Sequence, residues 1–312
     1  MLSGCVRRWL YSMRLDDIRD RFHPLYHLRR YPLSRKLLST VDIPIWAKLP
    51  GVSWKVRVRF IRHASLFMLS SGAEPGILTL FRLIQRQIGI RSFWDVGANL
   101  GYYSWIIKSA DSKSQVRMFE PETENLSLIR ATISRLGLED IIVRDVAVSD
   151  TSGQRCFMRD QVSGTTGGIA ESGNTFSQTH WNVTGEAQTM CTVSLDAERA
   201  NSRAADLIKI DVEGHEEAVI RGAQQTIRND QPILIFECFH GGNEIADFLG
   251  SLGYWIGNAE NLEDDRKNAC NFLALPTRHR SKLDTMRRCS TEEILLAASS
   301  REPRKVSANG IN

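Results

Sequence analysis

The spacing of hydrophobic and polar residues predicts that short strands alternate with helices through most of the chain. Strands are expected where short apolar runs occur, at residues 92–96, 116–119, 141–148, 189–195, 207–212, 232–239, 254–256 and 272–275. Helices are expected where apolar residues recur every three or four positions, at residues 102–109, 122–136, 216–228 and 243–252. Alternation of this kind indicates a doubly wound α/β fold with a mostly parallel, Rossmann-like sheet of about seven strands.

The same pattern divides the chain into three parts. Residues 1–89 form a basic, helical extension that prolines break into short pieces, and its last helix is expected at residues 77–88. Residues 90–276 contain the predicted sheet. Residues 277–312 form a basic tail that we expect to be partly disordered, with one short helix at residues 291–298. A Gly-, Ser- and Thr-rich stretch at residues 159–186 lacks periodicity, which favours a functional or disordered loop.

Composition narrows the class of protein. The chain is 42% hydrophobic and 24% charged, and its formal net charge of +4 lies largely in its two end segments. The middle therefore lacks the basic surface of a nucleic-acid-binding protein. The basic ends can contact polysaccharide or anionic lipid, the latter as a membrane-surface contact of the N-terminal region, and a plain solvated surface is the favoured alternative. The six cysteines are scattered without zinc-binding spacing, and residues 1–10 lack a secretory apolar core, so we expect reduced thiols in the cytoplasm.

A glycine-containing turn follows the first predicted strand, from Asp95 through Ala98 to Gly101. Open parallel sheets bind ligands at the carboxyl ends of their strands, and Gly97 and Gly101 would let the backbone come close to such a ligand. A dinucleotide fingerprint would have a second glycine where Asn99 stands. The acidic Asp95 also suits a ligand that carries an ammonium group and a sulfonium better than it suits a pyrophosphate.

Two later strand ends extend the predicted ligand site. Glu120 follows the turn by about twenty residues, at the end of the second strand, where a carboxylate can accept hydrogen bonds from both ribose hydroxyls. Asp145 and Ala147 lie near the end of the third strand, where they can contact an adenine ring. A plain surface turn is an equally good interpretation of Asp145.

The strand at residues 207–212 leads into the richest group of reactive side chains, which includes Asp211, Glu213 and His215. Transfer of a group to a hydroxyl requires a positioned oxygen and partial removal of its proton, so we predict His215 as the general base. Asp211 and Glu213 can orient that imidazole, hold the substrate or a cofactor amine, or bind a divalent cation, and we assign no metal. Glu237 is expected to face the same pocket, and His240 is a weaker candidate base.

Taken together, five blocks of sequence resemble the FkbM family of methyltransferases. The blocks are residues 93–104 (FWDVGANLGYYS), 119–121 (FEP), 145–150 (DVAVSD), 208–216 (IKIDVEGHE) and 235–237 (IFE). The resemblance implies a class I methyltransferase domain at residues 90–276, S-adenosylmethionine as methyl donor, and transfer to oxygen on sugars, polysaccharides, glycolipids or polyketide-type products. It also implies that Asp95, Gly97, Asn99 and Gly101 surround the methionine part of the cofactor and that Glu120 contacts the ribose.

We therefore expect an S-adenosylmethionine-dependent O-methyltransferase acting on a small-molecule or glycoconjugate acceptor. The alternatives are a nicotinamide-dependent oxidoreductase, which shares the glycine turn and the ribose-binding acid, and a non-catalytic member that binds cofactor or glycan only. Replacing Gly97 by Val or Glu120 by Ala is expected to abolish or greatly weaken cofactor binding and to leave the fold intact.

Overall fold

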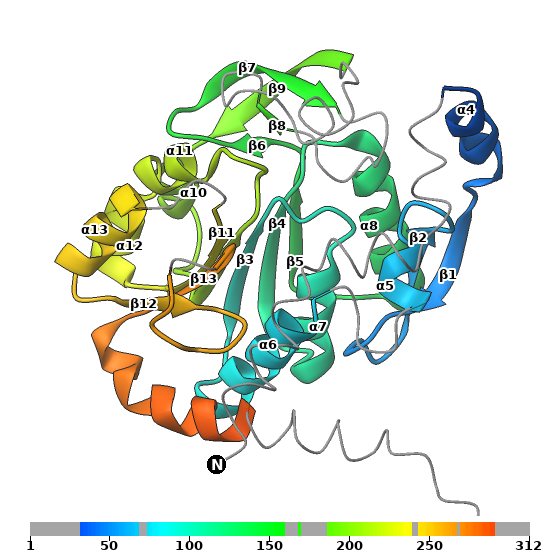
Figure 1. Ribbon diagram of the computed structural model, residues 1–312. Helices are drawn as coiled ribbons and strands as arrows, with labels where there is room; N and C mark the ends of the chain where they lie inside the picture. Colours follow the sequence, from blue (N-terminus) through cyan, green and yellow to red (C-terminus); the bar gives the residue numbers. More distant parts are fainter. Residues whose placement is uncertain are drawn as a thin grey trace, which may run out of the picture.

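A seven-stranded sheet forms the centre of the protein (Figure 1). The computed structural model describes residues 32–68, 74–159, 168–169, 186–238, 243–266 and 269–290. The strands lie in the order β12 (Trp255–Asn258), β13 (Asn271–Leu275), β11 (Ile233–Glu237), β10 (Leu207–Ile210), β3 (Ser92–Val96), β4 (Gln115–Phe119) and β5 (Ile141–Arg144). β13 pairs antiparallel with both neighbours and the other adjacent pairs are parallel, so the predicted sheet is confirmed.

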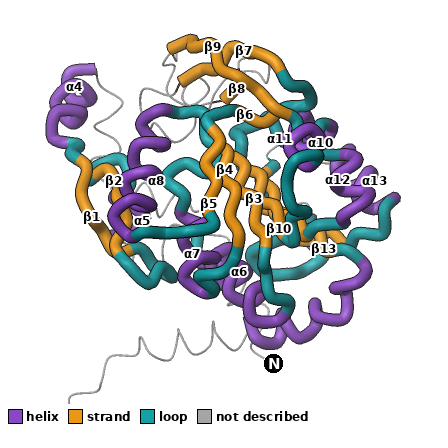
Figure 2. The backbone as a smooth tube through the Cα atoms, turned by 180° about the vertical axis from the view of Figure 1, so that it is seen from behind, coloured by secondary structure: helices purple, strands orange, loops and turns teal. Residues whose placement is uncertain are grey.

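Helices cover both faces of the sheet, as a doubly wound fold requires (Figures 1 and 2). Successive strand residues point to opposite faces, and accordingly Phe93 packs in one core cluster and Trp94 in the other. The first cluster includes apolar residues of α6 (Pro75–Gln87), α7 (Tyr102–Ala110) and α8 (Thr123–Leu136). The second includes apolar residues of α11 (Glu216–Arg221), α12 (Gln224–Asp230) and α13 (Asn243–Ser251).

The single strand predicted at residues 141–148 is two strands in two different sheets. β5 ends at Arg144, and β6 (Ala147–Val148) pairs instead with β9 (Glu186–Val193). A second sheet has the order β6-β9-β7-β8, in which β7 is Gly153–Arg159 and β8 is Gly168–Ile169. The strand predicted at residues 189–195 belongs to this second sheet. An apolar run indicates burial but does not specify the partner strand, so the pattern predicted β5 and β6 as one strand.

The helix expected at residues 216–228 is divided into α11 and α12 around Gly222. A Cβ atom at Gly222 would lie 2.2 Å from the backbone oxygen of Ser149, so the chain packs too closely there for a larger residue. Asp196 of α10 (Leu195–Arg199) accepts the backbone N–H of Thr226 in the first turn of α12 at 2.7 Å. These tertiary contacts accompany the interruption of the helix at Gly222. They cannot be recognised from the helical periodicity of the sequence.

The N-terminal segment contains a β-hairpin in addition to helices, so the expectation of a helical extension is incomplete. α4 (Pro32–Val41), α5 (Ala64–Met68) and α6 accompany β1 (Pro44–Lys48) and β2 (Lys55–Arg59), which pair antiparallel. Val56 and Val58 are buried between basic neighbours, which is the alternation of a strand. The same core cluster contains these valines and residues of the main sheet.

Some expectations fall on residues outside those described: residues 1–31, most of the loop at residues 159–186, His240, and the short helix expected at residues 291–298. The first part of the tail is described, as a 3₁₀ helix (Thr277–Lys282) followed by Leu283 and Met286, which are buried in the core. Among the helices of the described ranges, none has the length and apolar character needed to cross a lipid bilayer.

Candidate functional site

The carboxyl ends of β3 and β10 meet where the order of the chain reverses. From β3 the chain continues to β4 and β5 on one side, and from β10 it continues to β11 on the other. Open α/β sheets bind ligands in the crevice at such a switch point. The predicted glycine turn and the predicted acidic segment directly follow these two strands, so the structure brings the two segments together.

The turn after β3 packs tightly against the residue that follows β10. Gly97 has a φ of +77°, and a Cβ atom there would lie 1.8 Å from the backbone oxygen of Asp211. Gly101, with a φ of +84°, precedes α7, and the Trp105 ring would lie 2.9 Å from its Cβ. Asn99 has a φ of 53°, a left-handed conformation that Asn adopts more readily than most residues. The glycines are therefore required by close packing as well as by any ligand.

β4 holds this turn in place through its last residues. The backbone N–H groups of Gly97 and Ala98 each donate to the carbonyl oxygen of Phe119 at 3.0 Å. Glu120 then accepts the backbone N–H of Asn99 on Oε2 at 2.7 Å. The two features that the sequence placed about twenty residues apart are thus in direct contact.

Glu120 is buried at the start of the segment that leads into α8. Its Oε1 accepts the backbone N–H of Glu122 at 2.9 Å and the side-chain amide of Asn125 at 3.2 Å. Burial raises the pKa of Glu120 to about 8, although these N–H donors oppose the rise. Since an ionised carboxylate can accept about four hydrogen bonds, it keeps capacity for a ligand hydroxyl.

Three buried side-chain oxygens at this edge have no hydrogen-bond partner among the described residues: Asp95 Oδ1, Asn99 Oδ1 and Asn125 Oδ1. The other oxygen of Asp95 accepts the Ser104 hydroxyl at 2.6 Å. Burial raises the pKa of Asp95, and the nearby Lys209 opposes this rise. An unsatisfied buried acceptor costs about 1–3 kcal/mol, so such groups are rare in proteins. A ligand with ammonium or hydroxyl donors would satisfy them.

The carboxyl groups of Asp211, Glu213 and Glu237 form a cluster beyond β10 and at the end of β11. One oxygen from each lies within 4.8 Å of the others, a spacing that can hold a metal ion. Burial and the neighbouring Asp211 raise the pKa of Glu237 strongly, and the two side chains share a hydrogen bond. Burial raises the pKa of Asp211, but the charge of Lys209 and the hydrogen bonds from Glu237 and Lys209 together outweigh burial, so the pKa is lowered. Glu237 is therefore the protonated member of the pair.

Lys209 belongs to this site, although no role was predicted for it. Its Nζ lies 2.7 Å from Asp211 Oδ2 and 4.8 Å from the centre of the Tyr103 ring, and Tyr103 donates its hydroxyl to Glu74. Burial lowers the pKa of Lys209, but Asp211, Asp95 and Glu74 outweigh it and raise the pKa overall. Strand alternation puts Lys209 on the same face as Asp211, which is the signal that could have identified it. Glu74, which precedes α6, has no such pattern in the sequence.

His215, the predicted base, is directed toward Ser149. It is 8% exposed at the start of α11, and its Nε2 lies 2.9 Å from the Ser149 hydroxyl. Glu216 closes the loop before it, because its Oε1 accepts the backbone N–H groups of Val212 at 3.2 Å and Gly214 at 3.1 Å. Burial raises the pKa of Glu216 to about 7. Glu216 thus supports the loop, a role that the sequence did not predict for this member of the acidic segment.

Asp145 and Ala147, the predicted adenine contacts, have different surroundings. The Asp145 side chain is 56% exposed, beyond the end of β5, and lies 3.5 Å from Arg130. Ala147 is buried in β6 and packs in a small cluster with Phe157 of the second sheet. Asp145 is therefore accessible to a ligand, whereas the side chain of Ala147 contributes to the core of the second sheet.

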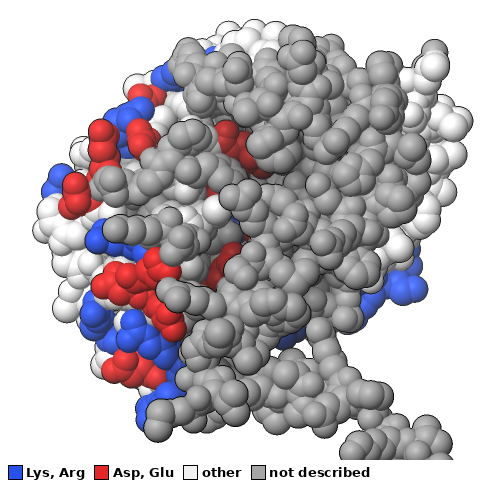
Figure 3. Space-filling view, in the orientation of Figure 1, with Lys and Arg blue, Asp and Glu red and all other residues white. Residues whose placement is uncertain are grey.

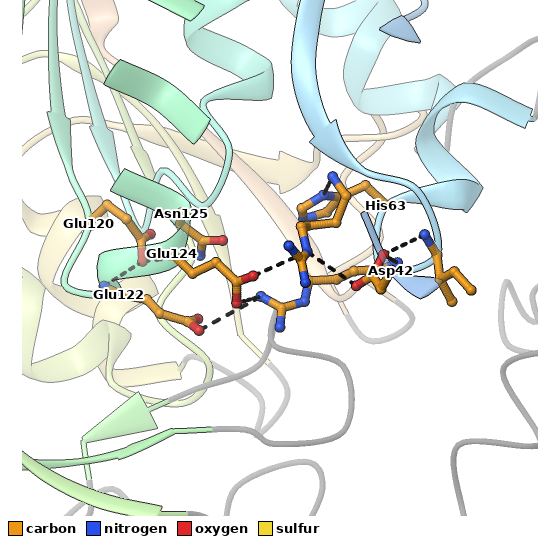
Figure 4. A network of polar contacts seen from close by, with 9 residues as sticks. Asp42, His63, Glu120, Glu122, Glu124 and Asn125 are labelled. Atoms are coloured by element: carbon orange, nitrogen blue, oxygen red, sulfur yellow. Dashed lines mark hydrogen bonds and ion pairs between the residues drawn. The ribbon is translucent and has the colours of Figure 1, made fainter. Parts of the chain in front are cut away.

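Ion pairs join the N-terminal hairpin to the start of α8 (Figure 4). Arg62 Nη1 lies 2.9 Å from Glu124 Oε2 and 3.8 Å from Glu122 Oε1. Arg59 Nε lies 3.1 Å from Glu124 Oε1. Because the backbone N–H of Glu122 donates to Glu120, the hairpin is connected to the carboxylate that holds the glycine turn.

Asp42 organises the turn that carries both arginines (Figure 4). Its Oδ1 accepts the backbone N–H groups of Ile61 at 2.6 Å and Arg62 at 3.2 Å, and its Oδ2 lies 3.4 Å from Arg59 Nε. His63 Nδ1 accepts the backbone N–H of Arg59 at 2.9 Å. The sequence did not predict this network, since its contacts join segments that are far apart along the chain.

The sequence pattern of the methyltransferase FkbM domain matches residues 95–256, slightly more than half of the chain. The match begins at Asp95 and includes the glycine turn, Glu120 and the acidic cluster. No curated protein matches the chain.

Several solved methyltransferase structures are similar to this chain at a low level. Methyltransferase FkbM from Methylobacillus flagellatus KT is 17% identical with a TM-score of 0.41, over 59% of this chain and 43% of that chain. The ribosomal protein L11 methylase from Lactobacillus delbrueckii subsp. bulgaricus is 13% identical with a TM-score of 0.36, over 63% and 75% of the two chains. The tRNA (uracil-54, C5)-methyltransferase from Pyrococcus abyssi, in complex with S-adenosyl-L-homocysteine, is 12% identical with a TM-score of 0.39, over 74% and 43%.

The matched part spans less than half the length of the Methylobacillus and Pyrococcus chains. With TM-scores below 0.5, these likenesses add nothing to the family match.

Proposed function

The chain belongs to the FkbM family of methyltransferases and takes S-adenosylmethionine as its cofactor, and from this premise we propose that it methylates a hydroxyl group of a sugar, polysaccharide, glycolipid or related natural product. The family match across the glycine turn and the acidic cluster is the observation that carries the proposal. It also excludes the nicotinamide-dependent oxidoreductase that the glycine turn alone left open. The cytoplasmic location stays a prediction.

The residues at the switch point fit this cofactor. The unpartnered Asp95 Oδ1 suits the cofactor ammonium, and Glu120, with the neighbouring Asn99 and Asn125 oxygens, suits its ribose hydroxyls. The exposed Asp145 is available for the adenine amino group. When bound, the cofactor supplies an electrophilic methyl group, and its binding would relieve the cost of three unsatisfied buried oxygens.

The acidic cluster is the proposed place of the acceptor hydroxyl. Glu213 lies within 4.8 Å of Asp211 and Glu237. Asp211 is paired with Lys209, and the strongly raised pKa of Glu237 keeps that side chain protonated. We favour the Glu213 carboxylate as the group that takes the hydroxyl proton. His215, whose Nε2 is directed to Ser149, is the competing base. Positioning the oxygen supplies most of the remaining rate enhancement.

Conservative substitutions distinguish the two bases. Glu213→Gln is expected to lower kcat by about 10²–10⁴-fold, the range typical of a general base, with cofactor affinity unchanged. His215→Gln is expected to lower kcat less than tenfold. The reverse order would assign the base to His215. Full turnover by a variant with Asp211, Glu213 and His215 all replaced by Ala would overturn this assignment of the site.

The acceptor itself is best identified in cells. Mass spectrometry of the sugars and glycolipids of wild-type and deletion cells should show a methyl ether that is missing from the deletion strain. The purified protein should then methylate the extracted, undermethylated glycan when S-adenosylmethionine is added. An unchanged glycan profile, together with a purified protein that binds cofactor and transfers nothing, would favour a non-catalytic binding protein.

A further inference from the structure

Exposed apolar side chains are concentrated in the N-terminal segment. Seven large hydrophobic residues of the described chain are exposed, and six of them lie between residues 33 and 68: Leu33, Leu37, Val41, Ile43, Phe60 and Met68. The seventh, Ile142, lies on the edge strand β5. Scattered single apolar residues are normal on a protein surface, but a group of six in one short segment is the composition of a docking surface.

α4 carries half of this surface as a stripe. Leu33, Leu37 and Val41 are four residues apart, so they lie on one face of the helix. Their exposed fractions are 86%, 68% and 49%, so this face does not pack against the domain. An amphipathic helix whose apolar face is left open is not explained by the stability of the fold.

The surface continues from α4 onto the hairpin. Ile43 follows Val41 closely, with a backbone hydrogen bond of 2.8 Å between them, and the backbone N–H of Phe60 donates to the Ile43 carbonyl at 3.0 Å. The Phe60 ring stacks on the Phe67 ring of α5 at a centroid distance of 6.3 Å, and Met68 is the next residue. The apolar groups therefore form one chain of neighbours across α4, the hairpin and α5.

Charge is strongly polarised toward the same segment. Residues 1–68 contain fourteen Lys and Arg against four Asp and Glu, whereas the rest of the chain contains twenty-six against thirty-two. Within residues 32–68 there are seven basic residues and one acidic residue. Lys48 and Lys55 are exposed and lie opposite each other in the hairpin. In Figure 3 the right-hand edge, where α4 and the hairpin lie in Figure 1, is white and blue.

We propose that α4 and the hairpin dock on an anionic lipid membrane, with the apolar stripe in the interface and the exposed Lys48 and Lys55 against the headgroups. Short amphipathic helices bind membranes in this way, and each basic residue near an anionic surface adds to the attraction. A second copy of this chain is a poorer occupant. A two-fold interface places the same patch on both sides, which would bring two positively charged segments together.

Vesicle sedimentation tests the proposal without any need to know the methyl acceptor. The full chain is mixed with phosphatidylcholine vesicles that do or do not contain phosphatidylglycerol. We expect binding to the anionic vesicles that falls as salt is raised, and weak binding to the neutral vesicles. Leu33→Gln with Leu37→Gln should weaken binding by about tenfold or more, since two apolar side chains lose their burial.

Ile142→Gln is the matched control, because it removes an exposed apolar side chain outside the segment and should bind like the wild type. Circular dichroism and thermal melting confirm that each variant folds. No binding of the wild type to anionic vesicles, or equal binding by the double variant, would overturn the proposal. A concentration-dependent dimer that the double variant loses, without vesicle binding, would assign the surface to self-association instead.

Discussion

The Oε2 atom of Glu120 accepts the backbone N–H of Asn99 at 2.7 Å, which ties the end of β4 to the glycine turn that follows β3. One side chain thus serves two purposes: it fixes the conformation of the turn, and it is the proposed acceptor for the ribose hydroxyls. Its protonation state should therefore control cofactor binding.

Cofactor affinity should rise with pH between about 7 and 9. The pKa of Glu120 is raised to about 8 without ligand, and the ionised carboxylate is the better acceptor, so binding favours loss of the proton. The ionised fraction grows roughly tenfold over this interval, which sets the largest expected change in Kd. Calorimetry at several pH values measures it. Glu120→Gln should bind the cofactor weakly, and its affinity should depend less on pH. The cofactor amine titrates equally in both measurements, so the difference between the two pH profiles is due to Glu120. Parallel profiles would contradict the prediction.

The same raised pKa should appear in the stability of the cofactor-free protein. Folding takes up a proton at Glu120, so its contribution is full below the unfolded pKa of about 4.5 and is lost as pH rises through about 8. Glu120→Gln should lose less stability than the wild type between pH 5 and pH 9 in urea titrations. An identical pH dependence in both proteins would show that Glu120 ionises normally.

Gly97→Ala is expected to destabilise the protein by at least about 2 kcal/mol, because of its φ of +77° and the contact of 1.8 Å that a Cβ would make with the Asp211 oxygen. The expectation that Gly97→Val leaves the fold intact is therefore wrong. Gly250→Ala is the control, since it lies in α13 with open space around it and no positive φ, and it should not lower Tm. Equal melting temperatures for the two variants would contradict the packing argument.

Arg62→Ala should weaken cofactor binding by several-fold, although Arg62 lies outside the sheet domain, in the turn between β2 and α5. The Arg62 side chain is 16% exposed and contacts the carboxylates of Glu124 and Glu122. The backbone N–H of Glu122 in turn donates a hydrogen bond to Glu120 and so helps to position it. A loss of about 1–2 kcal/mol in stability is expected from the partly buried pair. Arg221→Ala removes an exposed pair with Glu217 and serves as the control.

A double-mutant cycle separates positioning from general destabilisation. Arg62→Ala combined with Glu124→Ala should weaken cofactor binding by less than the sum of the two single variants, because each single variant already removes the same ion pair. Equal cofactor affinity of Arg62→Ala and the wild type would show that the ion pairs of Arg62 serve stability alone.

Glu237→Gln should retain stability within about 1 kcal/mol, because the pKa of Glu237 is strongly raised and the amide can donate to Asp211 as the neutral acid does. Asp211→Asn should cost more, about 2 kcal/mol, since it leaves the buried Lys209 without its ion pair. Urea titration near neutral pH measures both. A larger loss for Glu237→Gln than for Asp211→Asn would reverse the assigned protonation.

Methyl transfer should persist in excess EDTA. The three clustered carboxyl groups have the spacing of a metal site, but Lys209 already supplies a positive charge at 2.7 Å from Asp211 and Glu237 is held protonated. Both effects reduce the attraction of the cluster for a divalent ion. Loss of turnover in EDTA that returns with Mg²⁺ or Mn²⁺ would establish a metal-assisted reaction.

By itself, the sequence determined the parts that depend on local periodicity and on residue spacing. Alternating strand and helix patterns gave the mostly parallel sheet, and each predicted helix of the sheet domain has a counterpart within the described ranges. The separation of Asp95 and Glu120 along the chain predicted two residues of the ligand site, because parallel strands bring their carboxyl ends to one edge of the sheet. The family blocks gave the class of enzyme and its cofactor.

Only the tertiary structure decided which strand pairs with which and which side chains face each other. The run at residues 141–148 was divided between two sheets, and Gly222 broke a helix because Ser149 packs against it. The orientation of His215 toward Ser149 and the ion pairs of Arg62 with the start of α8 join residues that are far apart along the chain, and local patterns treat such residues separately. Periodicity reports burial within one element, whereas these contacts depend on the packing between elements.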